Sequence, residues 1–232
     1  MEKTYKVTHK VYYNDRLNKV LFHGKPTYPL YIQVTFDRKT TFFKSNFFEL
    51  LSKPKYGIPH LGKIYGPDLK DVIAKEEALI EFVVDKNLKN FSLEVFRKEY
   101  EFYSRDLLDE MEDGFRDYLY TFFHDEGMPW FAESLKVGSK LITPYDVAYD
   151  MKIALKPSMY EKMIENSVHY GPPYNVLYEF SKKFYKSPPF ILPLYEWAKL
   201  DIKEQFVDFM NKSYPDANVF DITKKIGQII GS

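Results

Sequence analysis

The chain has 232 residues, enough for one large or two small domains, and its 33 Lys and Arg balance 33 Asp and Glu to a formal charge of zero. A neutral total argues against a protein that coats polyanions, and 45% hydrophobic residues argue against a disordered chain. The absence of Cys excludes disulfides, thiolate metal ligands and cysteine nucleophiles. The charged start and the lack of a long apolar run predict neither a secretion signal nor a membrane helix, so we expect a protein of the host-cell cytoplasm or of a virion.

The neutral total conceals a charge gradient along the chain. Residues 1–70 sum to +8, residues 71–140 to −8 and residues 141–232 to zero. The basic segment favours an anionic partner, but neutralisation by the acidic segment, within one chain or between subunits, explains it equally well. Only five of the cations are Arg and none follows Arg116, so the C-terminal half lacks the planar cation most often used to clamp phosphoryl groups.

The first 50 residues predict a small antiparallel sheet with one apolar face. The segments concerned are rich in β-branched and aromatic residues, and residues 28–36 alternate well between apolar and polar. Asp37, Arg38 and Lys39 predict a tight turn, whereas repeated Gly and Pro over residues 52–67 predict a loop. We expect strands at 3–13, 28–36 and 40–47, with a short one at 20–22.

After residue 67 the apolar positions recur at helical spacing. Ser92 followed by Glu94 marks the start of a long helical pattern that runs to about residue 124, in which Gly114 is a possible break, and Gly127 with Pro129 ends it. We expect helices at 69–85, 93–124, after Thr143, and at 158–170, 172–185, 193–212 and 221–230. The predicted fold class is α+β, with a small β domain at 1–66, an acidic helical segment at 67–130 and a helical domain at 131–232.

The motifs of the common enzyme classes are absent from the sequence. No two of the five His stand at i, i+4 spacing, and neither a dinucleotide-binding glycine pattern nor a nucleophile elbow is present. Gly57 to Ile64 approaches a P-loop but lacks its hydroxyl residue, and His124 beside Asp125 is better explained as a histidine at a helix end. We therefore predict no catalytic residue, no metal ligand and no cofactor.

The aromatic content, with 20 Tyr and 20 Phe, is the most unusual feature of the composition. Four Phe between positions 42 and 48 lie close to lysines in the sequence, and they have two explanations. They form a platform on which nucleic-acid bases stack, or they form the core face of the sheet and of the helix that follows it. In the C-terminal third, tyrosines in a Pro-rich context predict a protein contact surface. The Phe in question are Phe42, Phe43, Phe47 and Phe48, and the predicted contact tyrosines are Tyr174, Tyr178, Tyr185 and Tyr195.

The order of these features resembles the N-terminal, arm-DNA-binding segment of tyrosine recombinases from Bacteroidota mobile elements. The resemblance rests on the strand Tyr-Pro-Leu-Tyr-Ile-Gln-Val-Thr-Phe at 28–36, the turn after it, the acidic helix after Pro67, Phe-Ser-Leu-Glu-Val-Phe at 91–96, and residues 115–124, which are similar to the opening helix of the family's core-binding domain. It implies a three-stranded sheet that lies in a DNA groove, with phosphate contacts from Arg16, Lys19, Lys25, Arg38, Lys39 and Lys44.

The chain departs from that family in its catalytic residues. The recombinase active site needs two Arg, a His-x-x-Arg motif and a nucleophilic Tyr, whereas this chain has no Arg after position 116 and no His-x-x-Arg. Recombination by this chain alone is therefore excluded. We expect a non-catalytic protein that binds duplex DNA through residues 1–70, as an accessory factor of a phage or mobile element.

Two alternatives stay open at this point. A neutral chain rich in aromatic residues also fits a structural subunit of a larger assembly, such as a phage head-tail or tail component, with homo- or hetero-oligomeric protein partners. An enzyme of unrecognised type is the other alternative. No membrane partner is expected.

Overall fold

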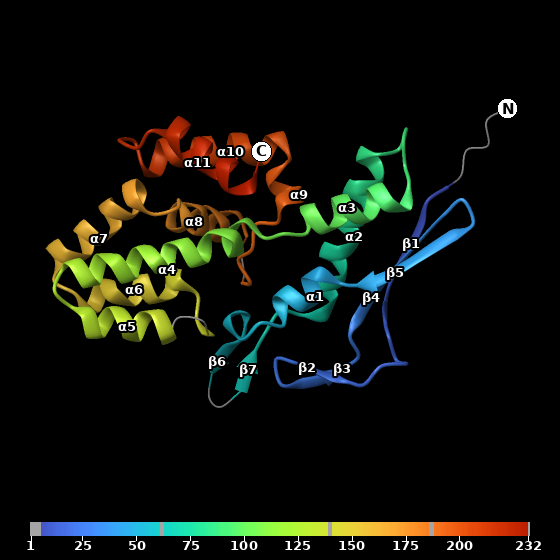
Figure 1. Cartoon of the computed structure of the whole chain (residues 1–232), viewed down its shortest axis with the longest axis horizontal. Coiled ribbons are helices and arrows are strands. Elements are labelled where there is room, and N and C mark those ends of the chain that lie inside the picture. Colours follow the sequence, from blue (N-terminus) through green and yellow to red (C-terminus); the bar gives the residue numbers. More distant parts are fainter. Residues whose placement is uncertain (1–5, 61–62, 139–140, 186–187, 232) are drawn as a thin grey trace. The chain divides into compact units, whose positions relative to one another are not determined.

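The computed structural model describes residues 6–60, 63–138, 141–185 and 188–231, with the backbone alone at 58–60 and 63–65. It confirms the predicted fold class, a small antiparallel sheet near the N-terminus followed by a mostly helical body (Figure 1). Of the expected strand at 3–13, the described part forms a strand from Thr8, while residues 3–5 lie outside the described residues.

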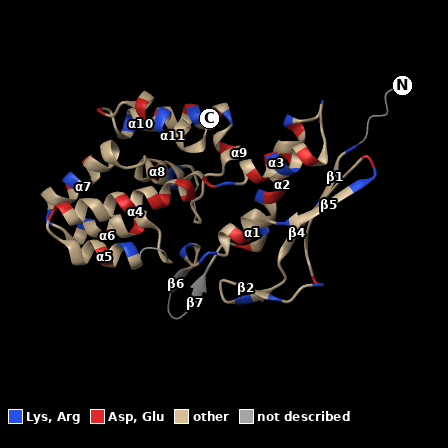
Figure 2. Cartoon of the chain, viewed as in Figure 1, with Lys and Arg blue, Asp and Glu red and all other residues tan. Residues whose placement is uncertain are grey.

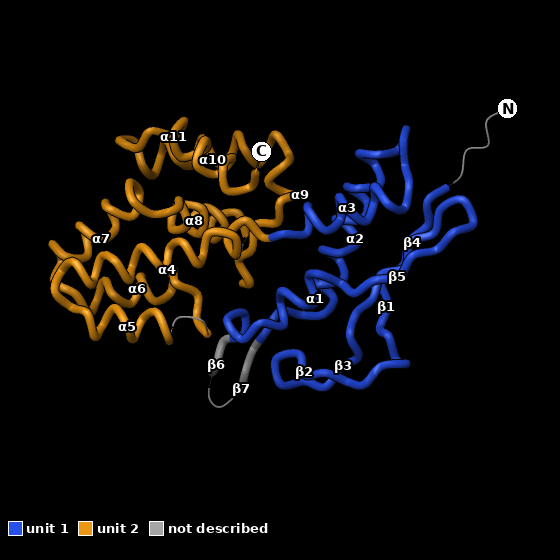
Figure 3. Tube along the Cα trace, in the orientation of Figure 1, with its two compact units in different colours: residues 1–105 blue, residues 106–232 orange. Residues whose placement is uncertain are grey.

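The chain divides into two compact units, residues 1–105 and residues 106–232 (Figure 3). This division differs from the boundaries at 66 and 130 that composition led us to expect. The two acidic helices after residue 67 bury apolar residues in the core of the first unit, so they belong with the sheet and not to a separate segment.

A three-stranded sheet in the order β1-β4-β5 forms one layer of unit 1. In the central strand Leu30, Ile32 and Val34 are fully buried, as their alternation predicts. Asp37 and Arg38 form the predicted tight turn with φ of 46° and 61°, the left-handed geometry that joins two strands through two residues. The strands of unit 1 are β1 (Thr8–Tyr13), β2 (Val20–Phe22), β3 (Lys25–Thr27), β4 (Leu30–Phe36), β5 (Lys39–Lys44), β6 (Ile58–His60) and β7 (Lys63–Tyr65).

In the described part of unit 1, three α-helices accompany the strands: α1 (Asn46–Leu51), α2 (Leu69–Lys86) and α3 (Leu93–Tyr103). The strand expected to continue through residue 47 ends earlier, because the Ser45 hydroxyl accepts a hydrogen bond from the Phe48 N–H and begins α1. The predicted loop at 52–67 also contains regular structure, a short 3₁₀ turn (Pro54–Tyr56) and the paired strands β6 and β7.

A buried carboxylate links the three helices of unit 1. Glu76 of α2 is fully buried, and its Oε1 accepts hydrogen bonds from the Ser45 hydroxyl at 2.5 Å and from the Phe47 N–H at 2.9 Å. The Tyr100 hydroxyl of α3 lies 2.9 Å from Oε2 and 3.1 Å from Oε1, and it accepts a hydrogen bond from the Asn46 N–H at 3.0 Å. The network fixes α1 and α3 against α2 on the covered side of the sheet.

Unit 2 is helical in its described part, and α4 contacts most of the helices around it. Phe115, Leu119 and Phe123 of α4 are buried in its core. The expected helix at 193–212 is interrupted after Trp197. The helix α4 ends at Asp125, as Gly127 and Pro129 predict, and the helix that begins at Pro129 was not expected. The helices are α4 (Leu107–Asp125), α5 (Pro129–Gly138), α6 (Pro144–Ala154), α7 (Pro157–Tyr170), α8 (Tyr174–Phe184), α9 (Leu194–Trp197), α10 (Leu200–Ser213) and α11 (Val219–Ile230).

The expected continuous helix from 93 to 124 is in fact two helices, α3 and α4, with a break before Asp106. The buried Asp106 carboxylate caps α4 by accepting from the N–H groups of Leu108 and Asp109. It also accepts a hydrogen bond of 2.7 Å from the Leu192 N–H, so it ties the start of α4 to the segment before α9. Among the helices of the described residues, none is both long and apolar enough to cross a membrane.

Candidate nucleic-acid interface

The sheet of unit 1 has one face covered by helices and one open face. On the covered face Phe43 contacts the rings of Phe96 and Tyr100, with centroids 6.1 and 4.8 Å apart. Because side chains alternate along each strand, the other residues of the three strands lie on the opposite face, where each is exposed or half-exposed. In the pairing register this open face has three rows, Tyr12-Tyr31-Lys44, Lys10-Gln33-Phe42 and Thr8-Thr35-Thr40.

The open face combines cations, aromatic rings and amide and hydroxyl groups, and none of its nine residues is acidic. Phe42 is 57% exposed although it is a large apolar residue in a strand. The ring centroids of Tyr12 and Tyr31 lie 6.4 Å apart, and Lys10 Nζ lies 5.7 Å from the Tyr12 centroid. Such a face offers charge to phosphates, hydrogen-bonding groups to base edges and flat apolar surface to bases or sugars.

Lys44 has a carboxylate neighbour, Glu49 of α1, with Nζ 3.3 Å from Oε1. Both side chains are 58% exposed, and ion pairs this exposed are worth at most about 1 kcal/mol. A phosphate can therefore replace Glu49 as the partner of Lys44 at small cost.

The six cations expected to contact phosphates are all exposed, but the structure distributes them over three places. Arg38 and Lys39 lie at the turn between β4 and β5, and Lys44 lies at the other end of β5 on the open face. The remaining three, Arg16, Lys19 and Lys25, lie in the connection after β1 and at the β2-β3 hairpin. Val20 and Leu21 of this hairpin line the same surface hollow as Lys44, so the hairpin lies at the Lys44 end of the sheet.

The charge gradient of the sequence follows the two compact units. Unit 1 contains 19 Lys and Arg against 13 Asp and Glu, and unit 2 contains 14 against 20, so their net charges are +6 and −6. Figure 2 shows basic residues at the turn between β4 and β5 and around β2, with acidic residues mainly on helices. The unit with the net positive charge is therefore the one that carries the open sheet face.

Sequence reasoning missed Lys10 and Gln33, which lie next to Phe42 in the middle row of the open face. The signal for Gln33 was present, because it alternates with the buried residues Ile32 and Val34 in a strand that was predicted correctly. Lys10 needed the pairing of β1 with β4, which the sequence of either strand alone does not give. Of the four Phe considered, Phe43, Phe47 and Phe48 belong to the core side, and Phe42 alone is exposed.

Three of the four tyrosines expected at a protein contact surface lie inside unit 2. Tyr174, Tyr178 and Tyr195 are between 1% and 6% exposed, and Tyr174 stacks on Phe115 with centroids 5.0 Å apart. These rings are core residues and offer no contact area on the surface; Tyr185, which is half-buried, is the only one of the four that reaches it. The pattern of aromatic residues in a Pro-rich segment did not distinguish core from surface.

Comparison of the chain with models of protein families, with curated proteins and with solved structures found no match. The resemblance to recombinase arm segments therefore stays a prediction that rests on the residues quoted for it. Within the described residues, no group of three or more His, Asp or Glu side chains is placed to hold a metal ion.

Proposed function

We propose that this protein binds duplex DNA through the open face of its β1-β4-β5 sheet, as a non-catalytic accessory factor of a phage or mobile element. The observation that carries the proposal is the composition of that face, in which Lys10, Gln33, Phe42 and Lys44 stand together on strands without a single acidic residue.

The dimensions of the sheet suit a DNA groove. Lys39 and Lys44 are five residues apart on β5, a distance of roughly 17 Å at about 3.3 Å per residue. This is about five base-pair steps along the axis of B-DNA, at 3.4 Å each. Lys10 and Lys44, on the two outer strands of the open face, can reach phosphates while Gln33, in the central strand, faces base edges, where a Gln amide pairs with adenine in the major groove.

The test is the salt dependence of the affinity of the whole chain for duplex DNA, measured by fluorescence anisotropy between 25 and 200 mM salt. Each phosphate contact contributes about 0.9 to the slope of log K against log salt, so Lys10→Ala and Lys44→Ala should each lower the slope by about one unit. Phe42→Ala should weaken binding without changing the slope, because the ring carries no charge.

The matched control is Lys98→Ala, which removes an exposed cation from α3, a helix on the covered side of the sheet. This variant should keep the parent affinity and slope. Absence of binding by the parent chain at 25 mM salt, or equal losses in the Lys98 and Lys44 variants, would contradict the proposed interface.

A second candidate function is assembly with other protein subunits, and exposed apolar residues of unit 2 favour it. Trp130 and Val137 of α5 are 84% and 76% exposed, and Ile153 of α6 is 86% exposed. On α5 the two residues are seven positions apart and therefore share one helix face. Apolar side chains exposed to this extent are typical of contact sites.

This second function is tested by the mass of the chain in solution as a function of concentration. Assembly through α5 predicts an oligomer that Trp130→Ser with Val137→Ser converts to a monomer, whereas Leu200→Ser, at an exposed apolar residue of α10, leaves it intact. A parent chain that is monomeric up to 100 µM would exclude self-assembly through this face.

A further inference from the structure

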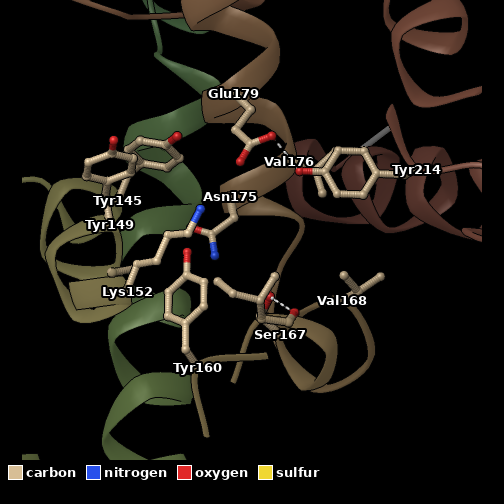
Figure 4. Close-up of a pocket in the computed structure, with 12 residues that line it drawn as sticks. Tyr145, Tyr149, Lys152, Tyr160, Ser167, Val168, Asn175, Val176, Glu179 and Tyr214 are labelled. Atoms are coloured by element: carbon tan, nitrogen blue, oxygen red, sulfur yellow. Dashed lines mark hydrogen bonds between the residues drawn. The ribbon is translucent and has the colours of Figure 1, made fainter. Parts of the chain in front are cut away.

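A cavity of about 160 Å³ lies in unit 2, between α6, α7, α8 and Tyr214 (Figure 4). For comparison, an engineered protein cavity of about 150 Å³ holds one benzene molecule. The space therefore suits a ligand of six to eight non-hydrogen atoms. It is independent of the sheet of unit 1, and nothing in the proposed function uses it.

The side chain of Asn175 is the reason to regard the cavity as a binding site. Asn175 lines the cavity and is only 8% exposed, yet neither Oδ1 nor Nδ2 has a hydrogen-bond partner within the described part of the chain. Buried amides in folded proteins nearly always have partners. Because both atoms lack one, flipping the amide does not help, and the missing partner must supply an acceptor for Nδ2 and a donor for Oδ1.

Two groups of opposite charge line the same cavity. Lys152 comes from α6, and Figure 4 shows its side chain and the Tyr160 hydroxyl directed toward Asn175. Glu179 follows Asn175 by one turn of α8, so both point to the same side of that helix. Its Oε2 accepts a hydrogen bond of 2.6 Å from the Tyr214 hydroxyl, and its other oxygen has no partner among the described residues.

Two of the four tyrosine rings that line the cavity, Tyr145 and Tyr149, already contact a cation of the protein. Tyr145 stacks on Tyr178, with centroids 4.3 Å apart and planes at 15°, and Lys182 Nζ lies 4.8 Å from the Tyr145 centroid. Lys182 Nζ also lies 5.7 Å from the Tyr149 centroid. Because Lys182 already occupies the position of a cation beside these rings, we expect them to line the cavity and not to bind a cationic ligand.

We propose that this cavity binds a small neutral α-amino acid as its zwitterion. The ligand carboxylate accepts hydrogen bonds from Lys152 and from Asn175 Nδ2, and the ligand ammonium donates to Asn175 Oδ1 and to Glu179. One lysine and one glutamate match the two charges of a zwitterion better than they match a singly charged ligand. The apolar parts of Ala148, Ile164 and Val176 contact a short side chain such as that of alanine or valine.

The experiment is calorimetric titration of the whole chain with L-alanine and L-valine. Isobutylamine, which is valine without its carboxylate, and 3-methylbutanoate, which is valine without its amine, serve as probes for the two charges. We expect binding of at least one amino acid, at least tenfold weaker binding of both analogues, and no binding of L-tryptophan, which is too large.

Variants separate this site from any other on the protein. Asn175→Leu keeps the size of the side chain and should weaken binding at least tenfold; Lys152→Met, at an exposed residue that leaves folding intact, should do the same. Lys156→Met, at an exposed lysine outside the cavity, is the control and should bind as the parent does.

Three results would overturn the proposal. The first is that a folded parent chain gives no heat of binding with alanine or valine at 10 mM. The second is that the parent binds valine and 3-methylbutanoate with equal affinity. The third is that Lys152→Met binds the amino acid with the affinity of the parent.

Discussion

Among single residues, Glu76 is expected to make the stability of the protein depend on pH. Burial raises the pKa of its carboxyl from 4.5 to about 7, although three hydrogen-bond donors favour the ionised form. Between these two pH values the folded chain keeps the proton that the unfolded chain has released. The folded state then binds more protons, so its stability falls as pH rises from about 4.5 to 7, by up to about 3 kcal/mol.

We expect Glu76→Gln to remove this pH dependence. Urea unfolding at pH 5, 6, 7 and 8 should give a free energy of unfolding that declines more steeply in the parent than in the variant. Glu77→Gln, at the exposed neighbouring carboxylate of the same helix, is the control and should follow the parent profile. Parallel pH profiles for the parent and Glu76→Gln would show that Glu76 titrates alike in the folded and unfolded chains.

At the scale of single elements, the turn between β4 and β5 holds a strained residue. Arg38 has φ of 61°, a conformation that costs a residue with a Cβ about 1 kcal/mol relative to glycine. Arg38→Gly should therefore raise the free energy of unfolding by about 1 kcal/mol. The midpoint of urea unfolding should rise accordingly, while the slope of the free energy against urea concentration stays unchanged.

Arg38→Ala is the matched control for this turn, because it removes the same charge but keeps the Cβ. It should not stabilise the hairpin, whereas both variants should lower the salt slope of DNA binding equally. Equal stability of the Gly and Ala variants would show that the backbone of the turn is not strained.

How far the sequence predicts an element depends on whether its signal is local. The alternation of β4 placed Ile32 and Val34 inside correctly, because one strand carries the whole pattern. The break between α3 and α4 was missed because Tyr103 and Leu107 continue the helical spacing across it. The residue that marks this break is Asp106, and an Asp at a helix start can be recognised from sequence. Its hydrogen bond with the Leu192 N–H cannot, because the two residues are 86 positions apart.

The two candidate sites were predictable to different extents for the same reason. The basic, aromatic character of the N-terminal sheet was evident from composition, but the row of Lys10, Gln33 and Phe42 depends on the pairing of three strands. In the helical unit, Asn175 lies within a correctly predicted helix, and no local pattern indicates that its amide is buried without a partner. Only the packing of α6, α7 and α8 around it creates the cavity.

At the scale of the whole molecule, the opposite charges of the two units determine how DNA binding should respond to division of the chain. Unit 1 carries +6 and unit 2 carries −6, and each has its own buried core, so fragments 1–105 and 106–232 should each unfold cooperatively. Fragment 1–105 should bind duplex DNA several-fold more tightly than the whole chain at 10 mM salt, because the tethered acidic unit no longer repels the phosphates.

That difference should shrink as salt rises, since the Debye length falls from about 30 Å at 10 mM to about 8 Å at 150 mM. Fragment 106–232 should not bind DNA at any salt concentration. Fluorescence anisotropy with one labelled duplex measures all three proteins under identical conditions, and circular dichroism verifies that both fragments are folded. Binding of DNA by fragment 106–232, or failure of a folded fragment 1–105 to bind DNA, would show that the interface is not on unit 1. Either result would contradict the proposed role of the open sheet face.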